Sequence, residues 1–236
     1  MNVNDFYKEL EKNNLFLSEL QKEQFRIYCD YLLDYNSHTN LTAIRDKEGV
    51  YLKHFLDSAS VGFVYKLTSE KILDIGTGAG FPGVVLKILF PEIRLTLIDS
   101  NNKKTTFLKK VLEKLNINDV TVLNDRVENI KEKEAFDIVT SRAVSELRIL
   151  AELSLPFLKL GGKVIALKSH IEEELSKAED TISILGGGSP NIKDINLPEE
   201  LGKRCFVEIK KVNSTDNIYP RVYDKILKYP LKKRSK

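Results

Sequence analysis

The chain has 236 residues, of which 42% are hydrophobic and 30% are charged, and its net charge is +3. This composition supports a sizeable core and excludes a chain that is disordered throughout. Its two cysteines, Cys29 and Cys205, are too few for a disulfide framework or a cysteine-rich zinc site, so we expect no bound metal.

Residues 1–68 are predicted to form a helical N-terminal subdomain. Apolar side chains recur there at spacings of three and four residues. Ser18 followed by Gln21 is typical of a capping box and predicts a helix that runs to about Asn36. We expect a further helix over residues 47–63.

From Lys71 onward, short apolar runs alternate with amphipathic segments. Strands are predicted at residues 71–75, 94–98, 120–124, 136–140, 163–167 and 205–212, and helices at 82–90, 103–115, 145–157 and 172–185. Such alternation favours parallel pairing, so we expect an α/β fold over residues 69–213 with a doubly wound, mostly parallel, Rossmann-like sheet in three layers. The Gly-Gly-Gly-Ser-Pro run at 186–190 and Pro198 predict a loop before the last strand, and we expect that strand to be the edge strand that closes the sheet.

Residues 214–236 are predicted to be a basic C-terminal tail. From Lys203 to Lys236 there are eleven Lys or Arg and three acidic residues, a surplus of eight positive charges that leaves the rest of the chain at −5. Such asymmetry favours a polyanionic partner such as nucleic acid, although a basic tail can also serve only to keep a protein in solution. We expect the tail to lie away from the cofactor loop described below.

No stretch of about 18 apolar residues occurs, and the first residues lack the basic and apolar regions of a signal peptide. We therefore expect no membrane association and a cytoplasmic location. We also expect a monomer.

A dense glycine loop, Leu-Asp-Ile-Gly-Thr-Gly-Ala-Gly-Phe-Pro-Gly at residues 73–83, lies where the first predicted strand passes into the next helix. Glycines allow a tight turn and a close approach of the backbone to a ligand. In an open parallel sheet, ligands bind at the carboxyl ends of the strands. The loop therefore predicts a nucleotide-type cofactor site that includes Gly76 and Gly78.

Two cofactors fit this loop. Gly78-x-Gly80-x-x-Gly83, with Asp99 21 residues after Gly78, satisfies the dinucleotide fingerprint and leaves an NAD-dependent oxidoreductase as an alternative. Three features favour S-adenosylmethionine (SAM). Asp74 stands two residues before Gly76, as in the first motif of class I methyltransferases. Asp99 can accept the hydroxyls of the adenosine ribose, and little chain remains for the separate substrate domain of a dehydrogenase.

The sequence after the fourth predicted strand limits which atoms can accept the methyl group. Enzymes that methylate exocyclic amines commonly carry Asn/Asp-Pro-Pro-Tyr/Phe there, whereas residues 140–143 are Thr-Ser-Arg-Ala. Carbon-5 pyrimidine enzymes need a cysteine nucleophile in an active-site loop, but Cys29 is predicted in a helix and Cys205 in a strand. What remains is an acceptor that is already nucleophilic, such as guanine N7, which needs orientation and no general base.

Six motifs together resemble one family. They are Asn-Leu-Thr-Ala-Ile at 40–44, His-Phe-Leu-Asp-Ser at 54–58, the glycine loop at 74–83, Leu-Ile-Asp-Ser at 97–100, Arg-Val-Glu at 126–128 and Ser-Arg-Ala at 141–143. The combination resembles the bacterial ribosomal small-subunit methyltransferase G family, also called glucose-inhibited division protein B. The resemblance implies a class I enzyme that uses SAM, releases S-adenosylhomocysteine and methylates N7 of a guanine in 16S ribosomal RNA. Its expected partner is small-subunit ribosomal RNA or the small-subunit particle.

The resemblance also implies where the cofactor binds. The cofactor-contacting positions are Gly76, Phe81, Val127, Glu128 and Arg142, to which the ribose argument adds Asp99 and the glycine loop adds Gly78. Lys168, which ends the fifth predicted strand at the same edge of the sheet, is a candidate catalytic residue. Two departures from the family pattern are Ser169, where members often have glycine, and a basic C-terminal motif kept only as Tyr219-Pro220-Arg221.

His54, Asp57 and Ser58 are the other candidate catalytic residues. Positions three and four residues apart are neighbours on a helix, so the pattern alone favours a hydrogen-bonded structural trio. The resemblance favours the border of the site where the target base enters, and the three can also hold the cofactor loop in place. For the whole chain, a non-enzymatic RNA-binding assembly factor with a vestigial cofactor loop stays as a third hypothesis.

Overall fold

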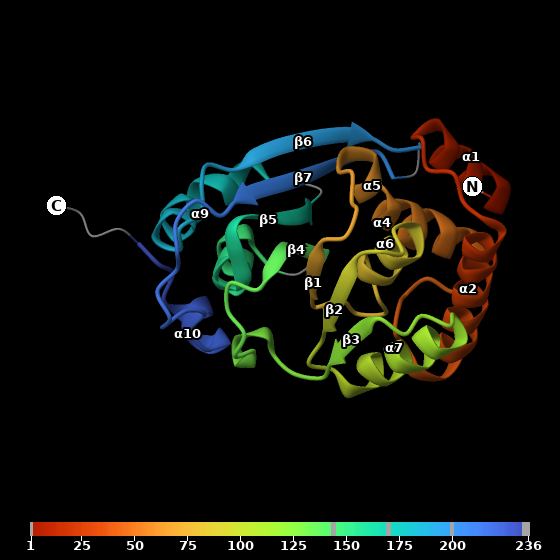
Figure 1. Cartoon of the computed structure of the whole chain (residues 1–236), viewed down its shortest axis with the longest axis horizontal. Coiled ribbons are helices and arrows are strands. Elements are labelled where there is room, and N and C mark those ends of the chain that lie inside the picture. Colours follow the sequence, from red (N-terminus) through yellow and green to blue (C-terminus); the bar gives the residue numbers. More distant parts are fainter. Residues whose placement is uncertain (1, 143–144, 169–170, 199–200, 233–236) are drawn as a thin grey trace.

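The strands of the computed structural model, which describes residues 2–142, 145–168, 171–198 and 201–232, form one seven-stranded sheet within these residues (Figure 1). The strand order is β3-β2-β1-β4-β5-β7-β6. The strands are β1 Lys71–Ile75, β2 Arg94–Ile98, β3 Val120–Leu123, β4 Phe136–Arg142, β5 Leu158–Lys168, β6 Asn191–Asn196 and β7 Lys203–Lys210. Strands β1 to β5 pair in parallel, and β7 pairs antiparallel with both β5 and β6. The predicted doubly wound, mostly parallel sheet is confirmed.

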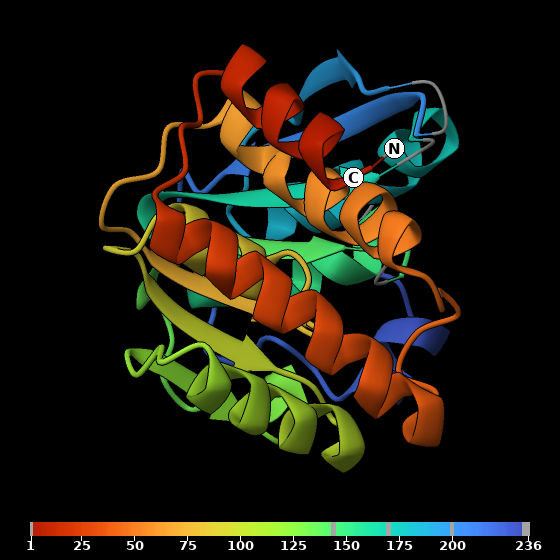
Figure 2. The same cartoon turned by 90° about the vertical axis from the view of Figure 1, so that its right-hand side faces the viewer.

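Helices cover both faces of the sheet, which gives three layers (Figures 1 and 2). On one face lie α1 Val3–Lys12, α2 Glu19–Thr39, α6 Gly83–Leu89 and α7 Asn102–Lys114, and on the other α8 Leu147–Ser154 and α9 Glu172–Ile184. Side chains alternate between the faces along each strand. In β5, for example, Ile165 and Leu167 enter the first core and Val164 and Ala166 the second.

The N-terminal helices share the first core with the sheet. Helix α2 begins at a reciprocal capping box between Ser18 and Gln21, as predicted. The hydroxyl of Tyr28 in α2 donates a hydrogen bond to the carbonyl of Ala79 at 2.5 Å. Helix α2 therefore contacts the glycine loop directly, and the division of the chain at residue 68 stays a prediction.

The span predicted as one helix over residues 47–63 is helical but divided. It consists of α3 Lys47–Gly49, the π-helix η1 Val50–Leu56, α4 Asp57–Ala59 and α5 Val61–Val64. The π-helical turn is a wider turn with i→i+5 hydrogen bonds, and such turns are frequent at functional sites. This turn carries His54, and Asp57 follows directly after it.

The expectation for the end of the sheet is wrong in one respect. The last strand, β7, lies between β5 and β6 rather than at the edge, and the edge strand is β6, inside a region predicted as loop. An edge strand buries little, so its sequence carries a weak apolar pattern. In β6, Ile192 is 38% exposed and Ile195 only packs on the border of the first core.

The described part of the C-terminal region packs against the second face. It ends in a short helix, α10 Tyr223–Lys228, beside α8 (Figure 1). Arg221 donates from Nε and Nη2 to the two carboxylate oxygens of Glu152 at 2.6 and 2.7 Å, and the Glu152 side chain is 1% exposed. Lys211 is also buried and donates from Nζ to the carbonyl of Leu155. Part of the basic surplus is therefore used inside the protein.

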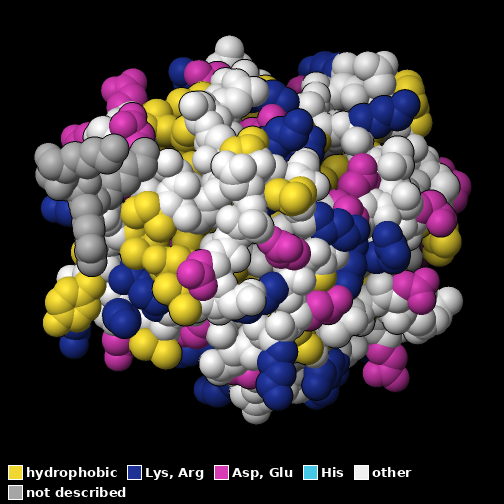
Figure 3. Space-filling model, turned by 60° about the vertical axis from the view of Figure 1, so that its left-hand side comes forward, with side chains coloured by type: hydrophobic (Ala, Val, Ile, Leu, Met, Phe, Trp, Pro, Cys, Tyr) yellow, Lys and Arg dark blue, Asp and Glu magenta, His cyan; other side chains and the backbone are white. Residues whose placement is uncertain are grey.

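Other basic residues of this region are exposed, as Lys225 and Lys228 of α10 are. On the face drawn in Figure 3, Lys and Arg side chains are interspersed with acidic and hydrophobic ones. Residues 233–236, which hold three charges of the predicted tail, lie outside the described residues. Within the part of the chain that is described, no helix has both the length and the apolar character needed to cross a bilayer.

Arg221→Ala is expected to lower the free energy of unfolding by about 3–5 kcal/mol, because it leaves Glu152 buried and charged without its partner. Urea unfolding followed by circular dichroism measures the change. The control is Arg26→Ala, which removes a guanidinium from exposed ion pairs with Glu23 and Asp30 and should leave the unfolding midpoint nearly unchanged. A loss for Arg221→Ala no larger than that of the control would contradict an internal role for Arg221.

Candidate active site

The glycine loop joins β1 to α6 along a backbone path that suits glycine. Gly76 and Gly78 both have φ of 63°, in the left-handed region that other residues avoid. At the end of the loop, a Cβ on Gly83 would lie 2.5 Å from Leu97 Cδ2 and 2.7 Å from Asp74 Oδ2. Glycine is therefore needed first for the turn and then for close packing of α6 on the sheet.

Asp74, near the end of β1, holds this loop from inside. Its Oδ2 accepts a hydrogen bond from Thr77 Oγ1 at 2.6 Å and from the Gly83 amide at 2.9 Å. The residue is fully buried, and its Oδ1 has no partner among the described residues. Burial raises the pKa of Asp74 to about 7, although the bonds from Thr77 and Gly83 act in the opposite direction.

Asp99 follows β2 directly and holds the other side of the loop. Its Oδ2 accepts from the Gly78 amide at 3.0 Å and its Oδ1 from the Asn101 amide at 2.9 Å. Lys104 Nζ lies 3.5 Å from Oδ2. A carboxylate has about four lone-pair positions, so Asp99 retains acceptor capacity for the hydroxyls of a ligand.

A cleft of about 280 Å³ opens beside the start of the glycine loop. It is lined by Ile75, Gly76, Ile98, Ser100, Asp125, Arg126, Val127, Glu128, Leu153 and Tyr223. It brings together Gly76, Val127 and Glu128, three residues that the sequence predicts as cofactor contacts. Tyr223 comes from α10, so the expectation that the C-terminal region lies away from the cofactor loop is wrong. The chain after β7 packs along α8 and reaches this cleft.

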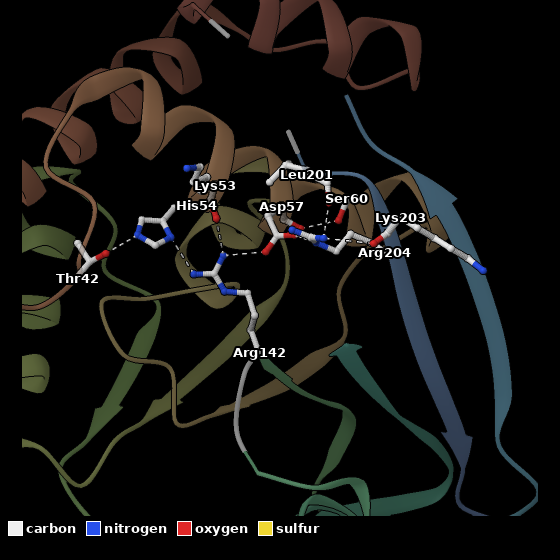
Figure 4. Close-up of polar contacts among 9 residues, drawn as sticks. All are labelled: Thr42, Lys53, His54, Asp57, Ser60, Arg142, Leu201, Lys203 and Arg204. Carbon is white, nitrogen blue, oxygen red and sulfur yellow. Dashed lines mark hydrogen bonds and ion pairs between the residues drawn. The ribbon is translucent and has the colours of Figure 1, made fainter. Parts of the chain in front are cut away.

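A second cluster at the same edge of the sheet connects segments that are far apart in the sequence (Figure 4). Arg142, the last residue of β4, donates from Nη1 to Asp57 Oδ2 at 3.1 Å and to the Lys53 carbonyl at 3.2 Å. Its Nη2 lies 3.1 Å from His54 Nδ1. Arg204 of β7 donates from Nε to Asp57 Oδ1 at 2.6 Å. The Asp57 carboxylate therefore bridges two guanidinium groups from two different strands.

The contacts of His54 define its tautomer. A guanidinium group only donates, so Nδ1 accepts from Arg142 and the ring proton is on Nε2, which donates to Thr42 Oγ1 at 2.8 Å. Burial and the positive charge of Arg142 lower the pKa of His54 to about 3. At neutral pH the ring is neutral and both nitrogens are engaged, so it offers neither a free base nor a proton donor.

Phe81 connects the glycine loop to this cluster. Its ring stacks on the His54 imidazole with centroids 4.5 Å apart, and it also stacks on Tyr28 at 5.5 Å. The guanidinium carbon of Arg142 lies 4.9 Å from the centroid of the Phe81 ring. Phe81 is itself buried. A shift of the loop would therefore be transmitted to both His54 and Arg142.

Two predicted catalytic residues lie outside the cluster. Ser58 is fully buried, and its Oγ has no hydrogen-bond partner among the described residues. Lys168 Nζ donates to the Ser145 carbonyl at 2.6 Å and to Glu174 Oε2 at 2.8 Å. The departure at Ser169 lies outside the described residues. Over the described chain, no group of three or more His, Cys, Asp or Glu side chains is placed to hold a metal ion.

Three residues in these clusters are not singled out by the sequence patterns. Thr42 lies in a quoted motif without an assigned role, Arg204 only counts toward the basic surplus near the C-terminus, and Tyr223 belongs to none of the motifs. Arg204 reaches Asp57 because β7 pairs antiparallel with β5, which places its first residues at the carboxyl edge of the parallel strands. Only a signal for that pairing in the sequence would have indicated its position.

His54 should make the native state lose stability on acidification. Its folded-state pKa of about 3 lies below its unfolded value, so the unfolded chain binds more protons from about pH 6.5 downward and stability falls with pH, by at most about 1.4 kcal/mol per pH unit. The free energy of unfolding in urea, measured between about pH 6.5 and pH 5, should therefore fall more steeply for wild type than for His54→Gln. Asp74 titrates with the opposite sign in both proteins, so the difference in slope isolates His54. Equal slopes would contradict a neutral, buried His54.

Comparison with known proteins assigns the family. A sequence profile of the family described as rRNA small subunit methyltransferase G matches residues 21–201. The ribosomal RNA small subunit methyltransferase G of Staphylococcus carnosus (strain TM300) is 40% identical over 240 residues, which cover 99% of this chain and 100% of that protein. The protein of the same name from Staphylococcus aureus (strain JH9) is 42% identical over 226 residues, with 94% and 95% covered. Among solved structures, a SAM-dependent methyltransferase from Aquifex aeolicus shares the fold, with a TM-score of 0.54 at 16% identity over 74% of this chain and 98% of that one. The chain belongs to the ribosomal RNA small subunit methyltransferase G family.

Proposed function

We propose that this protein transfers the methyl group of SAM to N7 of a guanine in 16S ribosomal RNA, and that it acts in the cytoplasm on the RNA or the small-subunit particle. The observation that carries the proposal is the glycine loop with its adjoining cleft at the carboxyl edge of the sheet, in a chain of this family. Membership of a methyltransferase family decides against the oxidoreductase alternative.

The described residues fit SAM. A Cβ placed on Gly78 would meet no atom within 4 Å, so the loop leaves room for a ligand beside its backbone. Asp99 would accept the ribose hydroxyls with its remaining lone pairs, and Val127 and Glu128 would line the adenosine end. When bound, SAM supplies a methyl group on a sulfonium centre.

The second cluster would position groups at the methyl-transfer end. Arg142 is held by Asp57, by the Lys53 carbonyl and by His54, so its guanidinium has a fixed place at the sheet edge. We assign His54 and Asp57 as positioning residues for Arg142. Guanine N7 carries no proton and needs only alignment with the methyl group. A neutral His54 with both nitrogens engaged supports transfer without a general base.

Ser58 and Lys168 have supporting places in this proposal. Ser58 is fully buried directly after Asp57, and Lys168 would fix the start of α8 through Ser145 and Glu174. Glu174 Oε2 also accepts the Leu147 amide at 2.6 Å, which ties the same carboxylate to the first turn of α8. Lys168 would have to leave both partners before it could contact a substrate.

Neither cysteine is suited to a covalent mechanism. Cys29 and Cys205 are both buried. Burial raises the pKa of Cys29 to about 12 and that of Cys205 to about 11. Both thiols are therefore protonated at neutral pH, and a protonated thiol is a poor nucleophile.

Gly78→Ala is expected to weaken SAM binding, because the new methyl group projects into the space proposed for the cofactor. Gly161→Ala, in the amino-terminal half of β5, is the matched control. Both glycines have positive φ, 63° and 82°, with open space around a Cβ, and each substitution should cost about 1–2 kcal/mol of stability. Calorimetry on the folded variants should show reduced SAM affinity for Gly78→Ala alone. Equal affinities for the two variants would place the cofactor elsewhere.

The purified protein should methylate 16S RNA taken from cells that lack its gene. Borohydride followed by aniline should then cleave that RNA at the modified guanine, which identifies N7 as the acceptor. Cys29→Ala/Cys205→Ala should retain turnover if it folds, because no covalent adduct is needed.

Each result that contradicts these expectations would reject a different part of the proposal. Methyl transfer without cleavage would reject N7, and loss of turnover in the folded double variant would require a covalent mechanism. Binding of both SAM and RNA without any transfer would favour the assembly-factor hypothesis.

A further inference from the structure

We propose that Tyr223 of the C-terminal helix α10 is a cofactor-binding residue, so that the end of the chain builds one wall of the SAM cleft. This inference rests on the proposed function, because it names a further contact for the same cofactor. None of the sequence motifs that indicate the cofactor site extends to this part of the chain, since the last of them ends at residue 143.

Tyr223 is attached to the residues predicted to hold the adenosine. It lines the same cleft as Gly76, Val127 and Glu128. Its amide donates to Glu128 Oε1 at 3.3 Å, and the guanidinium carbon of Arg126 lies 5.4 Å from its ring centroid. The Glu128 side chain is only 7% exposed, so few other groups are available to its carboxylate, and this amide helps to fix it. Tyr223 therefore both lines the cleft and orients a neighbouring cofactor contact.

The position of Tyr223 is fixed from both sides along the chain. Two residues before it, Arg221 forms the bidentate pair with buried Glu152. Three residues after it, Ile226 is buried in the second core, and its carbonyl accepts from Arg148 Nη1 at 3.4 Å. The backbone on both sides of Tyr223 is therefore held before a ligand binds, and such preorganisation favours affinity.

The chemistry of this wall suits adenine. The cleft presents apolar side chains, Ile75, Val127 and Leu153, next to the aromatic ring of Tyr223. Adenine is a flat aromatic base, and stacking of a base on an aromatic side chain corresponds to about a 5- to 150-fold gain in affinity. A hydroxyl group is not needed for such a contact, so the ring should account for the effect.

The test compares SAM dissociation constants, measured by calorimetry on the full-length chain. Tyr223→Ala should raise the dissociation constant at least about fivefold, whereas Tyr223→Phe should stay near wild type because it keeps the ring. The matched control is Tyr229→Ala, the same change at an aromatic side chain that is 65% exposed just after α10, and it should have no effect. Tyr223→Leu keeps apolar volume but lacks the aromatic face, so it should also weaken binding and serves if Tyr223→Ala does not fold.

Kinetics provide a second readout. Loss of a cofactor contact alone should raise KM for SAM while kcat at saturating SAM stays close to wild type. Unchanged or tighter SAM binding by a folded Tyr223→Ala or Tyr223→Leu protein would overturn the inference, and tighter binding would identify the ring as an obstruction of the cleft. If wild type itself binds no SAM, the proposed function fails; if wild type binds SAM and the Tyr223 variants bind it equally well, only this inference fails.

Discussion

The hydrogen bonds to the buried carboxylate of Asp74 set the path of the glycine loop, and the rest of the site depends on that path. One oxygen takes the Thr77 hydroxyl and the Gly83 amide, so the chain must turn back within nine residues and begin α6 against the strand it has just left. A side chain at position 83 would collide with the same oxygen. The Asp74 carboxylate therefore needs glycine at position 83, and the Gly83 amide needs the carboxylate as its acceptor.

Phe81 and Asp99 connect the glycine loop to the two sides of the site. Phe81 packs against His54 and Arg142 on one side of the site, while Asp99 binds the Gly78 amide on the other. Tyr28 reaches the loop from α2 and stacks on Phe81. The N-terminal helices thus help to position the site, and a change in their packing would shift Arg142.

The sequence predicts best where one local pattern carries the information. The glycine loop is of this kind, because positive φ and close packing demand glycine at particular positions. The central strands are another case, since parallel strands buried on both faces give continuous apolar runs. Edge strand β6 escapes prediction because it buries only one side of a few residues. The trio that the spacing predicts does not form by direct hydrogen bonds: His54 and Asp57 are linked only through Arg142, and Ser58 is buried without a partner among the described residues.

Contacts between distant segments could not be predicted from local patterns. Arg142 lies 85 residues after Asp57, and Arg204 lies 147 residues after it, so their convergence on one carboxylate depends on the order and register of β4, β5 and β7. Arg221 shows the same limit, because an excess of basic residues gives no sign that one of them belongs inside the protein.

Because Glu152 pairs with Arg221, the final packing of α8 depends on a residue that is synthesised much later. The chain is synthesised from its N-terminus, and Glu152 precedes its partner by 69 residues. Until Arg221 leaves the ribosome, α8 cannot pack fully on the sheet without burying an unpaired carboxylate. A product cut short after β7 would therefore be less stable than the full chain, even though it keeps all seven strands of the described sheet.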